Sequence, residues 1–146
     1  MPHADPPSDW SIEKMAELGA RHAALEAEGA LDPLLDTLAP DPVYEFHPVG
    51  LRMRGDALVR RFYEQFCERF LPLRAGFTLV GEWVNETSVA QEYDVSLRVD
   101  GSVETHRVLG ILHARGDRLG GERVYASERF IRLMTGALFD ELEPLG

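Results

Sequence analysis

Acid–base chemistry is open to His106, the one histidine in the segment VETHRVLGIL, residues 103 to 112, which is rich in valine, leucine and isoleucine. An imidazole group changes its charge near about pH 6.5, so a histidine that faces a cavity can take up and return a proton. The same side chain can instead contact a ligand, or it can be a hydrogen-bonded core residue. Its role depends on the face of the strand to which it points.

The turn Asp100-Gly101 decides that face. An Asp-Gly pair between two strands predicts a two-residue β-hairpin loop, and the preceding segment QEYDVSLRV alternates apolar and polar residues as a half-buried strand does. A hairpin with this loop pairs Val95 with His106 and Tyr93 with Val108. Because Tyr93 and Val95 belong to the apolar side of their strand, His106 is predicted to face inward.

The segment ARGDRL, residues 114 to 119, predicts the next turn. With a loop of either two or four residues, the register places Ser127 opposite His106. The polar residues of the last strand that then face inward are Arg123, Tyr125 and Ser127. An inward arginine is costly to bury alone, so Arg123 must meet a carboxylate such as Glu104, or an anionic or carbonyl group of a ligand.

Side chains from other elements join these on the concave side of the predicted sheet. A three-residue loop at residues 85 to 87 places Trp83 inward, Tyr63 lies on an aromatic helix face, and His47 ends a strand. The residues expected to contact a small-molecule ligand are His47, Tyr63, Trp83, Gln91, Tyr93, Arg123, Tyr125 and Ser127. A few polar groups on an apolar concave surface are typical of such a pocket, although the aromatic members could equally be core residues.

The elements that must position these residues form one predicted domain, residues 11 to 136. A proline-rich lead-in at residues 1 to 10 precedes it and is predicted to be disordered, and a short helix or tail at residues 137 to 146 follows. The predicted order is a helix from Ser11 to Gly29, a short helical segment, the strand VYEFH, a helix from Asp56 to Pro72, and then strands. His22, in the first helix, is predicted to be a surface residue.

Composition excludes several classes of protein. The chain has 146 residues, with 15 Lys and Arg against 25 Asp and Glu, a net charge of -10 that would repel nucleic acid. Its apolar runs are shorter than the roughly 18 residues of a membrane span. The single cysteine excludes an internal disulfide and fits a cytoplasmic location, and no Cys/His spacing suggests a metal. We therefore expect no nucleic-acid or membrane partner, no metal and no cofactor.

Two motifs carry a resemblance to a known family: VYEFHPVGLRMRGDALVRRFY, residues 43 to 63, and the final strand with Tyr125. They resemble the nuclear transport factor 2-like superfamily, and within it the SnoaL-like, polyketide cyclase-like group. The resemblance implies an α+β fold in which a cone-shaped, curved antiparallel sheet wraps around N-terminal helices, a cystatin-like arrangement. It also implies a hydrophobic small-molecule ligand. Members of the superfamily include cyclases, isomerases, dehydratases and hydrolases, but also binding and trafficking domains, so the fold does not choose the function.

One departure from the family pattern bears on mechanism. Many enzymatic members carry an acid near the end of the last strand, whereas this chain reads Tyr125-Ala126-Ser127 there. Glu128 comes one residue later and would point away from the pocket unless a bulge intervenes. We therefore keep three hypotheses: a cofactor-independent cyclase, isomerase or dehydratase with His106 as its acid–base residue, a non-catalytic ligand-binding module, and a dimeric interaction domain with a vestigial cavity.

The opposite faces of the last two strands predict a homodimer. The residues that point outward in the same register are Leu109, Ile111, Val124, Ala126 and Phe130, all apolar. An apolar surface of this size is a liability unless it is covered. Because the helices lie on the other side of the sheet in this fold, we expect a second subunit to cover it, with a C-terminal helix over part of it as the alternative.

Overall fold

The computed structural model of the chain describes residues 5 to 146. The helices are α1 (Ile12–Glu28), α2 (Leu31–Asp36), α3 (Asp56–Gln65) and α4 (Glu128–Thr135). A π-helical turn (Phe66–Phe70) and a 3₁₀ turn (Leu71–Leu73) extend α3, and a second 3₁₀ turn (Gly136–Glu141) follows α4. The strands are β1 (Leu38–His47), β2 (Leu51–Arg54), β3 (Arg74–Val84), β4 (Ser88–Val99), β5 (Ser102–Arg115), β6 (Arg118–Tyr125) and β7 (Glu143–Pro144).

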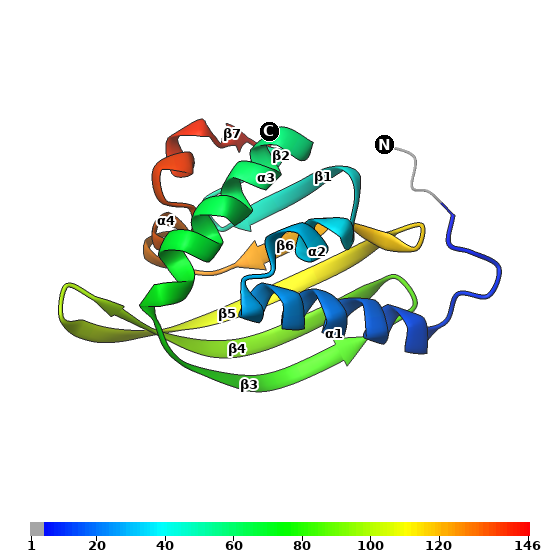
Figure 1. Cartoon of the computed structure of the whole chain (residues 1–146), viewed down its shortest axis with the longest axis horizontal. Helices are drawn as coiled ribbons and strands as arrows, with labels where there is room; N and C mark the ends of the chain where they lie inside the picture. Colours follow the sequence, from blue (N-terminus) through cyan, green and yellow to red (C-terminus); the bar gives the residue numbers. More distant parts are fainter. Residues whose placement is uncertain (1–4) are drawn as a thin grey trace.

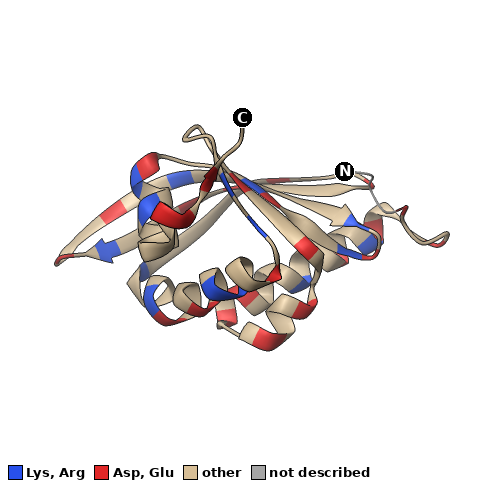
Figure 2. Cartoon of the chain, turned by 90° about the horizontal axis from the view of Figure 1, so that it is seen from above, with Lys and Arg blue, Asp and Glu red and all other residues tan. Residues whose placement is uncertain are grey.

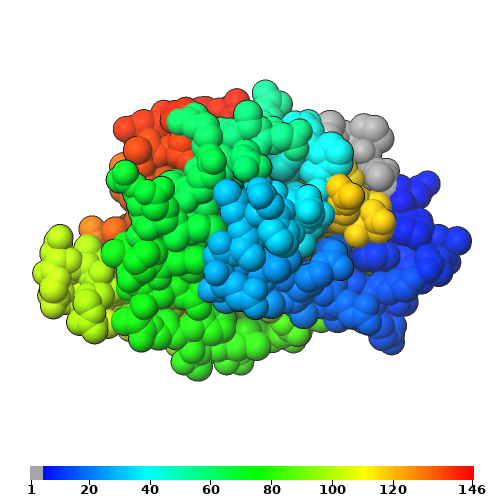
Figure 3. All heavy atoms as spheres, viewed as in Figure 1, coloured from blue at the N-terminus to red at the C-terminus, as the bar shows by residue number. Residues whose placement is uncertain are grey.

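The strands form one curved sheet in the order β3-β4-β5-β6-β1-β2-β7, antiparallel except where β1 pairs with β6. Helices α1, α2 and α3 lie against one face, which we call the inner face, and leave the opposite, outer face bare (Figure 1, Figure 2). Figure 3 shows that this helical layer hides most of the sheet, while the β4–β5 turn projects beyond it. The α+β class and the curved sheet around N-terminal helices are thus confirmed.

Helix α1 begins and ends where its sequence dictates. The Ser11 side chain accepts a hydrogen bond from the Lys14 backbone N–H, which caps the first turn, and Gly29 ends the helix in the left-handed conformation (φ 68°). Met15, Leu18 and His22 recur at helical spacing and are buried. The prediction that His22 is a surface residue is therefore wrong: it is only 2% exposed.

The register of the β4–β5 hairpin is confirmed. Asp100 and Gly101 both adopt positive φ angles (50° and 81°), as the two-residue turn requires. Val95 pairs with His106 and Tyr93 pairs with Val108, so both strands turn the predicted side chains inward.

The predicted register of β5 with β6 is wrong by one residue beyond the turn. Ala114 pairs with Leu119 as predicted, but His113 then pairs with Gly121, because Gly120 is an extra residue in β6. Gly121 has a φ of 142° and lies against the Val43 backbone of β1. A shift of one residue exchanges the two faces of a strand.

The bulge at Gly120 changes which side chains of β6 face the helices. Glu122 and Val124 pair with Leu112 and Gly110 and turn to the inner face. Arg123 and Tyr125, which were predicted to face inward, lie on the outer face instead.

A second bulge moves Trp83. Val84 pairs with Val89, so the β3–β4 loop is one residue longer than predicted, and a register shift between Leu79 and Gly81 restores the expected parity. Phe77 therefore faces inward as predicted. Trp83 lies on the outer face, where its ring covers Gly81 and is 58% exposed.

The chain does not continue as a strand after Tyr125. Ser127 is the N-cap of α4, where its side chain accepts a hydrogen bond from the Phe130 backbone N–H. This helix turns Phe130 back into the core at 1% exposure, and Ala126 is buried as well. With Val124 on the inner face, three of the five residues expected on an apolar outer surface belong to the core.

Candidate functional site

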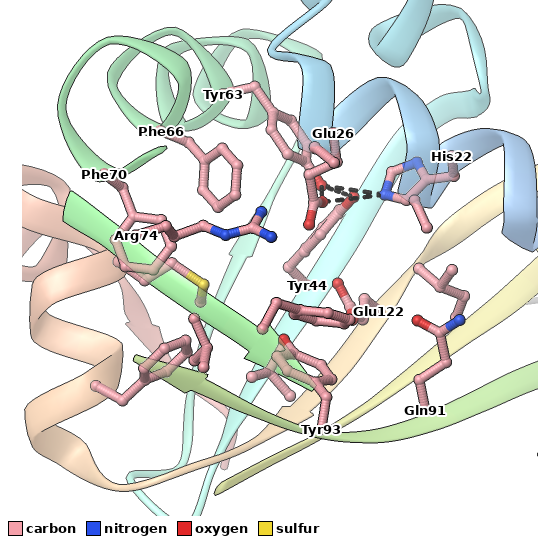
Figure 4. Close-up of a pocket in the computed structure, with 18 of the residues that line it drawn as sticks. His22, Glu26, Tyr44, Tyr63, Phe66, Phe70, Arg74, Gln91, Tyr93 and Glu122 are labelled. Atoms are coloured by element: carbon pink, nitrogen blue, oxygen red, sulfur yellow. Dashed lines mark hydrogen bonds and ion pairs between the residues drawn. The ribbon is translucent and has the colours of Figure 1, made fainter. Parts of the chain in front are cut away.

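A cavity of about 310 Å³ lies between the inner face of the sheet and the helices. The phenyl rings of Phe62, Phe66, Phe70 and Phe130 supply much of its apolar lining. Among the described residues that line it, the polar and charged ones are His22, Glu26, Tyr44, Tyr63, Arg74, Gln91, Tyr93 and Glu122 (Figure 4). An apolar concavity with a small number of converging polar groups is the usual form of a small-molecule site.

A hydrogen-bonded pair of tyrosines lies at the α1 side of this cavity. The hydroxyl oxygens of Tyr44, from β1, and Tyr63, from α3, are 2.7 Å apart. Tyr63 also donates to Glu26 Oε2 at 3.2 Å. Because each hydroxyl carries one hydrogen, Tyr44 must then donate to Tyr63. Burial raises the pKa of both phenols well above the ordinary value, so both stay protonated and act as hydrogen-bond donors.

A hydrogen-bond chain through Thr37 orients the His22 ring. The Thr37 hydroxyl donates its hydrogen to the Leu34 carbonyl oxygen at 2.7 Å, so it can only accept from His22 Nδ1, which lies 2.8 Å away. His22 Nδ1 therefore carries a hydrogen. Its Nε2 lies 3.4 Å from both the Tyr63 hydroxyl oxygen and Glu26 Oε2.

Glu122 is the carboxyl group that faces the cavity from the sheet. Position 110 is a glycine, and a side chain there would overlap the Glu122 carboxylate, so Gly110 provides its space. In the described part of the chain, no group hydrogen-bonds to this carboxyl. Burial, together with the negative charge of Glu26, raises its pKa to about 8. The group is therefore mostly protonated at pH 7 and can give or take a proton in the range where enzymes work.

Three polar groups near the β3 and β4 strands complete the lining. The Tyr93 ring packs against Phe77, with ring centroids 5.1 Å apart, and burial raises the pKa of its hydroxyl well above the ordinary value. Gln91 Nε2 donates to Glu82 Oε2 at 2.6 Å. The guanidinium carbon of Arg74 lies 5.4 Å from the centroid of the Phe77 ring. Tyr93 has no hydrogen-bond partner among the described residues, so its hydroxyl is free to bind a ligand.

The structure brings together only some of the side chains that the sequence predicted for a site. Tyr63, Gln91 and Tyr93 line the cavity. The members of the predicted set that do not line it are His47, Trp83, Arg123, Tyr125 and Ser127. On the outer face the His47 ring stacks on Tyr125, with centroids 4.8 Å apart, and its Nε2–H donates a hydrogen bond to Glu45 Oε1 at 3.0 Å.

His106 is on the inner face but outside the cavity lining. Its ring packs against Phe130 at 5.5 Å between centroids, and its Nε2 lies 2.8 Å from Glu104 Oε1. Two hydrogen bonds from Arg129 and one shared with His106 lower the Glu104 pKa to about 2. Ser127 Oγ lies 3.4 Å from His106 Nδ1. These contacts connect α4 to β5, so the interactions of His106 in the structure are structural ones.

Sequence reasoning missed five of the polar residues at the cavity: His22, Glu26, Tyr44, Arg74 and Glu122. For two of them, His22 and Glu122, the sequence held a signal. His22 follows Leu18 at the i+4 position of the apolar side of its helix, which is the buried position. The doublet Gly120-Gly121 inside a strand pattern is a signal of a bulge, and a bulge there turns Glu122 inward.

Comparisons with known proteins identify the fold. No family model matches the sequence, and no curated protein matches it. Solved structures do match. An NTF2-like protein from Anabaena variabilis superimposes with a TM-score of 0.64 at 21% identity, covering 80% of this chain and 91% of that one. A Bacillus subtilis protein described as a candidate isomerase gives a TM-score of 0.64 at 19% identity, covering 85% and 94%.

A third match is a hypothetical protein from Catenulispora acidiphila with a ketosteroid isomerase-like fold, solved in complex with trimethylamine. It gives a TM-score of 0.59 at 18% identity and covers 82% of this chain and 92% of that one. At these identities the likeness is one of fold: the chain has the nuclear transport factor 2-like fold. Within residues 5 to 146, no helix is long and apolar enough to span a membrane, and no cluster of three potential metal ligands occurs.

Proposed function

We propose that this protein is a cofactor-independent enzyme of the SnoaL-like type that moves a proton on a hydrophobic carbonyl compound, with Glu122 as its acid–base residue. The observation that carries the proposal is the Glu122 carboxyl itself, which lines the cavity without a hydrogen-bond partner in the described chain and has a pKa of about 8. A general base works best when its pKa lies near the working pH.

The proposed reaction needs two groups. The Glu122 carboxylate takes a proton from the carbon next to the carbonyl group and returns it to another atom of the same molecule, which shifts a double bond without net consumption of protons. The negative charge that develops on the carbonyl oxygen needs a donor. Tyr93 supplies it, because its hydroxyl has no other partner in the described chain, whereas the Tyr44 hydroxyl is committed to Tyr63.

The structural relatives support a small-molecule reaction rather than an alternative role. One match is described as a candidate isomerase and another was solved with trimethylamine bound. An interior filled by Trp83, Tyr93 and Tyr125 would favour the vestigial-cavity hypothesis. Trp83 and Tyr125 are instead 58% and 39% exposed on the outer face, and a volume of about 310 Å³ is left open.

Deuterium exchange tests the proposal without knowledge of the natural substrate. The protein is incubated in D₂O with a panel of enolisable ketones, such as 1-tetralone and cyclohexenone, and deuterium uptake next to the carbonyl is measured by mass spectrometry. We expect the wild type to accelerate exchange of at least one ketone, with a rate that rises with pH and levels off above about pH 8, because the carboxylate form is the base.

Two variants test whether Glu122 is the base that removes the proton. Glu122→Gln should lower the exchange rate by at least about 100-fold, in the range typical of a lost general base. His106→Gln is the matched control and should retain the rate, because His106 does not line the cavity. Exchange that survives in Glu122→Gln and is lost in His106→Gln would overturn the proposal in favour of His106. Ligand binding without exchange would favour a non-catalytic binding module.

A further inference from the structure

Arg74 is a cation that faces the cavity without a carboxylate partner. It is the first residue of β3, and its side chain enters the cavity beside Phe66 and Phe70 (Figure 4). Among the described residues no acid forms an ion pair with it, although its guanidinium carbon lies over the Phe77 ring at 5.4 Å. The guanidinium N–H groups of Arg74 are therefore available to a ligand in the cavity.

The missing protein partner is informative because of where Arg74 lies. Half of the 14 arginines form ion pairs among the described residues, as Arg107 does with Asp94 and Glu92, and of the unpaired ones Arg74 is the one that lines the cavity. A cation that is half-buried among phenyl rings has lost part of its hydration, and that loss has to be compensated by a counter-charge or by water. Arg74 is the arginine whose counter-charge is missing inside the cavity.

The position of Arg74 relative to Glu122 gives the site two distinct ends. Both groups act on the ionisation of Tyr93: the negative charge of Glu122 raises the pKa of its hydroxyl, and the positive charge of Arg74 lowers it. Tyr93 therefore lies within electrostatic reach of both. A ligand that fills the cavity meets a cation at the β3 side and a protonatable acid at the β6 side, with phenyl rings between them.

We propose that the ligand is a hydrophobic carboxylic acid whose carboxylate binds Arg74 while its carbonyl-bearing carbon skeleton extends toward Tyr93 and Glu122. A guanidinium group matches a carboxylate with two parallel hydrogen bonds, and the aromatic lining suits an apolar body. This inference rests on the proposed function in that it names the substrate class of the same site, but the binding end that it assigns is separate from the reacting end.

Three probes with one hydrophobic body test it: 2-naphthylacetate, 2-naphthylacetamide and 2-(2-naphthyl)ethylamine, titrated by calorimetry at neutral pH. We expect the acetate to bind at least about tenfold more tightly than the amide, as a charge-assisted bidentate contact provides. Arg74→Gln should abolish this preference while the affinity for the amide stays the same. Arg74→Lys should retain part of the preference, because it keeps the charge and loses the planar fork.

Arg69→Gln is the matched control, since Arg69 is exposed, lies outside the cavity lining and gives the same change of net charge. It should bind all three probes like the wild type. Equal binding of acetate and amide, tightest binding of the amine, or binding of none of the three would overturn the inference. The amine result would mean that Glu26 and Glu122 select a cation. Thermal melts of each variant establish that it is folded.

Glu122→Gln separates this inference from the proposed function. It should keep the preference for acetate over amide while it loses deuterium exchange. Acetate preference in a protein that exchanges no ketone would refute only the enzymatic role. Exchange that depends on Glu122, with no acetate preference, would refute only the assignment of Arg74.

Discussion

Glu122 illustrates at the scale of one residue how a functional group can oppose stability. Its pKa is raised from 4.5 to about 8 in the folded chain, so the folded state binds more protons than the unfolded state between those values. Ionisation of Glu122 therefore costs no folding stability below about pH 4.5, and the free energy of unfolding falls as the pH rises through the folded-state pKa. An ion-paired carboxylate, whose pKa is lowered by folding, has the opposite pH dependence.

Glu122→Gln should remove this penalty. Each pKa unit corresponds to about 1.4 kcal/mol, and after allowance for the water that reaches the cavity we expect a gain of about 2–4 kcal/mol at pH 9. Near pH 4 the carboxyl is mostly neutral in both the folded and the unfolded wild type, so the variant should match it there within about 0.5 kcal/mol. Urea unfolding at both pH values measures the difference. An equal gain at the two pH values would show that packing, not ionisation, is responsible.

At the scale of the elements, the sequence predicts a strand's inner and outer faces only as far as its turn and its ladder are regular. The Asp100-Gly101 turn predicted the register of β4 with β5 along its whole length, because no residue interrupts that ladder. The same reasoning failed one hairpin later, because the extra residue Gly120 reverses the parity of everything beyond it. Gln91 and Tyr93 were found for this reason, and Glu122 was not.

Gly121→Ala tests how strongly the β6 bulge is determined. A Cβ atom there would overlap the Val43 carbonyl oxygen of β1, and the φ of 142° is unfavourable for any L side chain. We expect a loss of more than about 3 kcal/mol of unfolding free energy, or failure to fold. Gly76→Ala is the control: its nearest neighbours lie 3.8 Å away in Ser96, so it should cost about 1 kcal/mol or less. A mild effect at Gly121 would mean that β1 can move away from β6.

At the scale of the whole molecule, none of the helices within residues 5 to 146 covers the outer face of the sheet (Figure 2). Val124 belongs to the core, but the outward positions of β5 include Leu109 and Ile111, while Tyr125 is exposed on β6 and Trp83 on β3. An uncovered sheet face that carries such apolar side chains favours association with a second copy about a two-fold axis.

We expect the protein to be a homodimer at micromolar concentration, and Ile111→Glu to convert it to a monomer because a charge would be buried in the contact. Sedimentation equilibrium measures both. Thr105→Glu, at an exposed position nearer the tip of the same strand, is the control for added charge and should leave the dimer intact. A wild-type monomer would show that the outer face tolerates water.

The bulge of β6 has a consequence for how chains of this fold can diverge. One strand carries two alternative sets of side chains, Glu122 with Val124 and Arg123 with Tyr125, and the count of residues at Gly120 selects the set that faces the cavity. Loss or gain of a single codon there would replace an acid by a cation in the cavity wall without a single substitution. Aligning such chains column by column would then equate residues from opposite faces, so homologous positions in the gene need not be equivalent positions in the cavity.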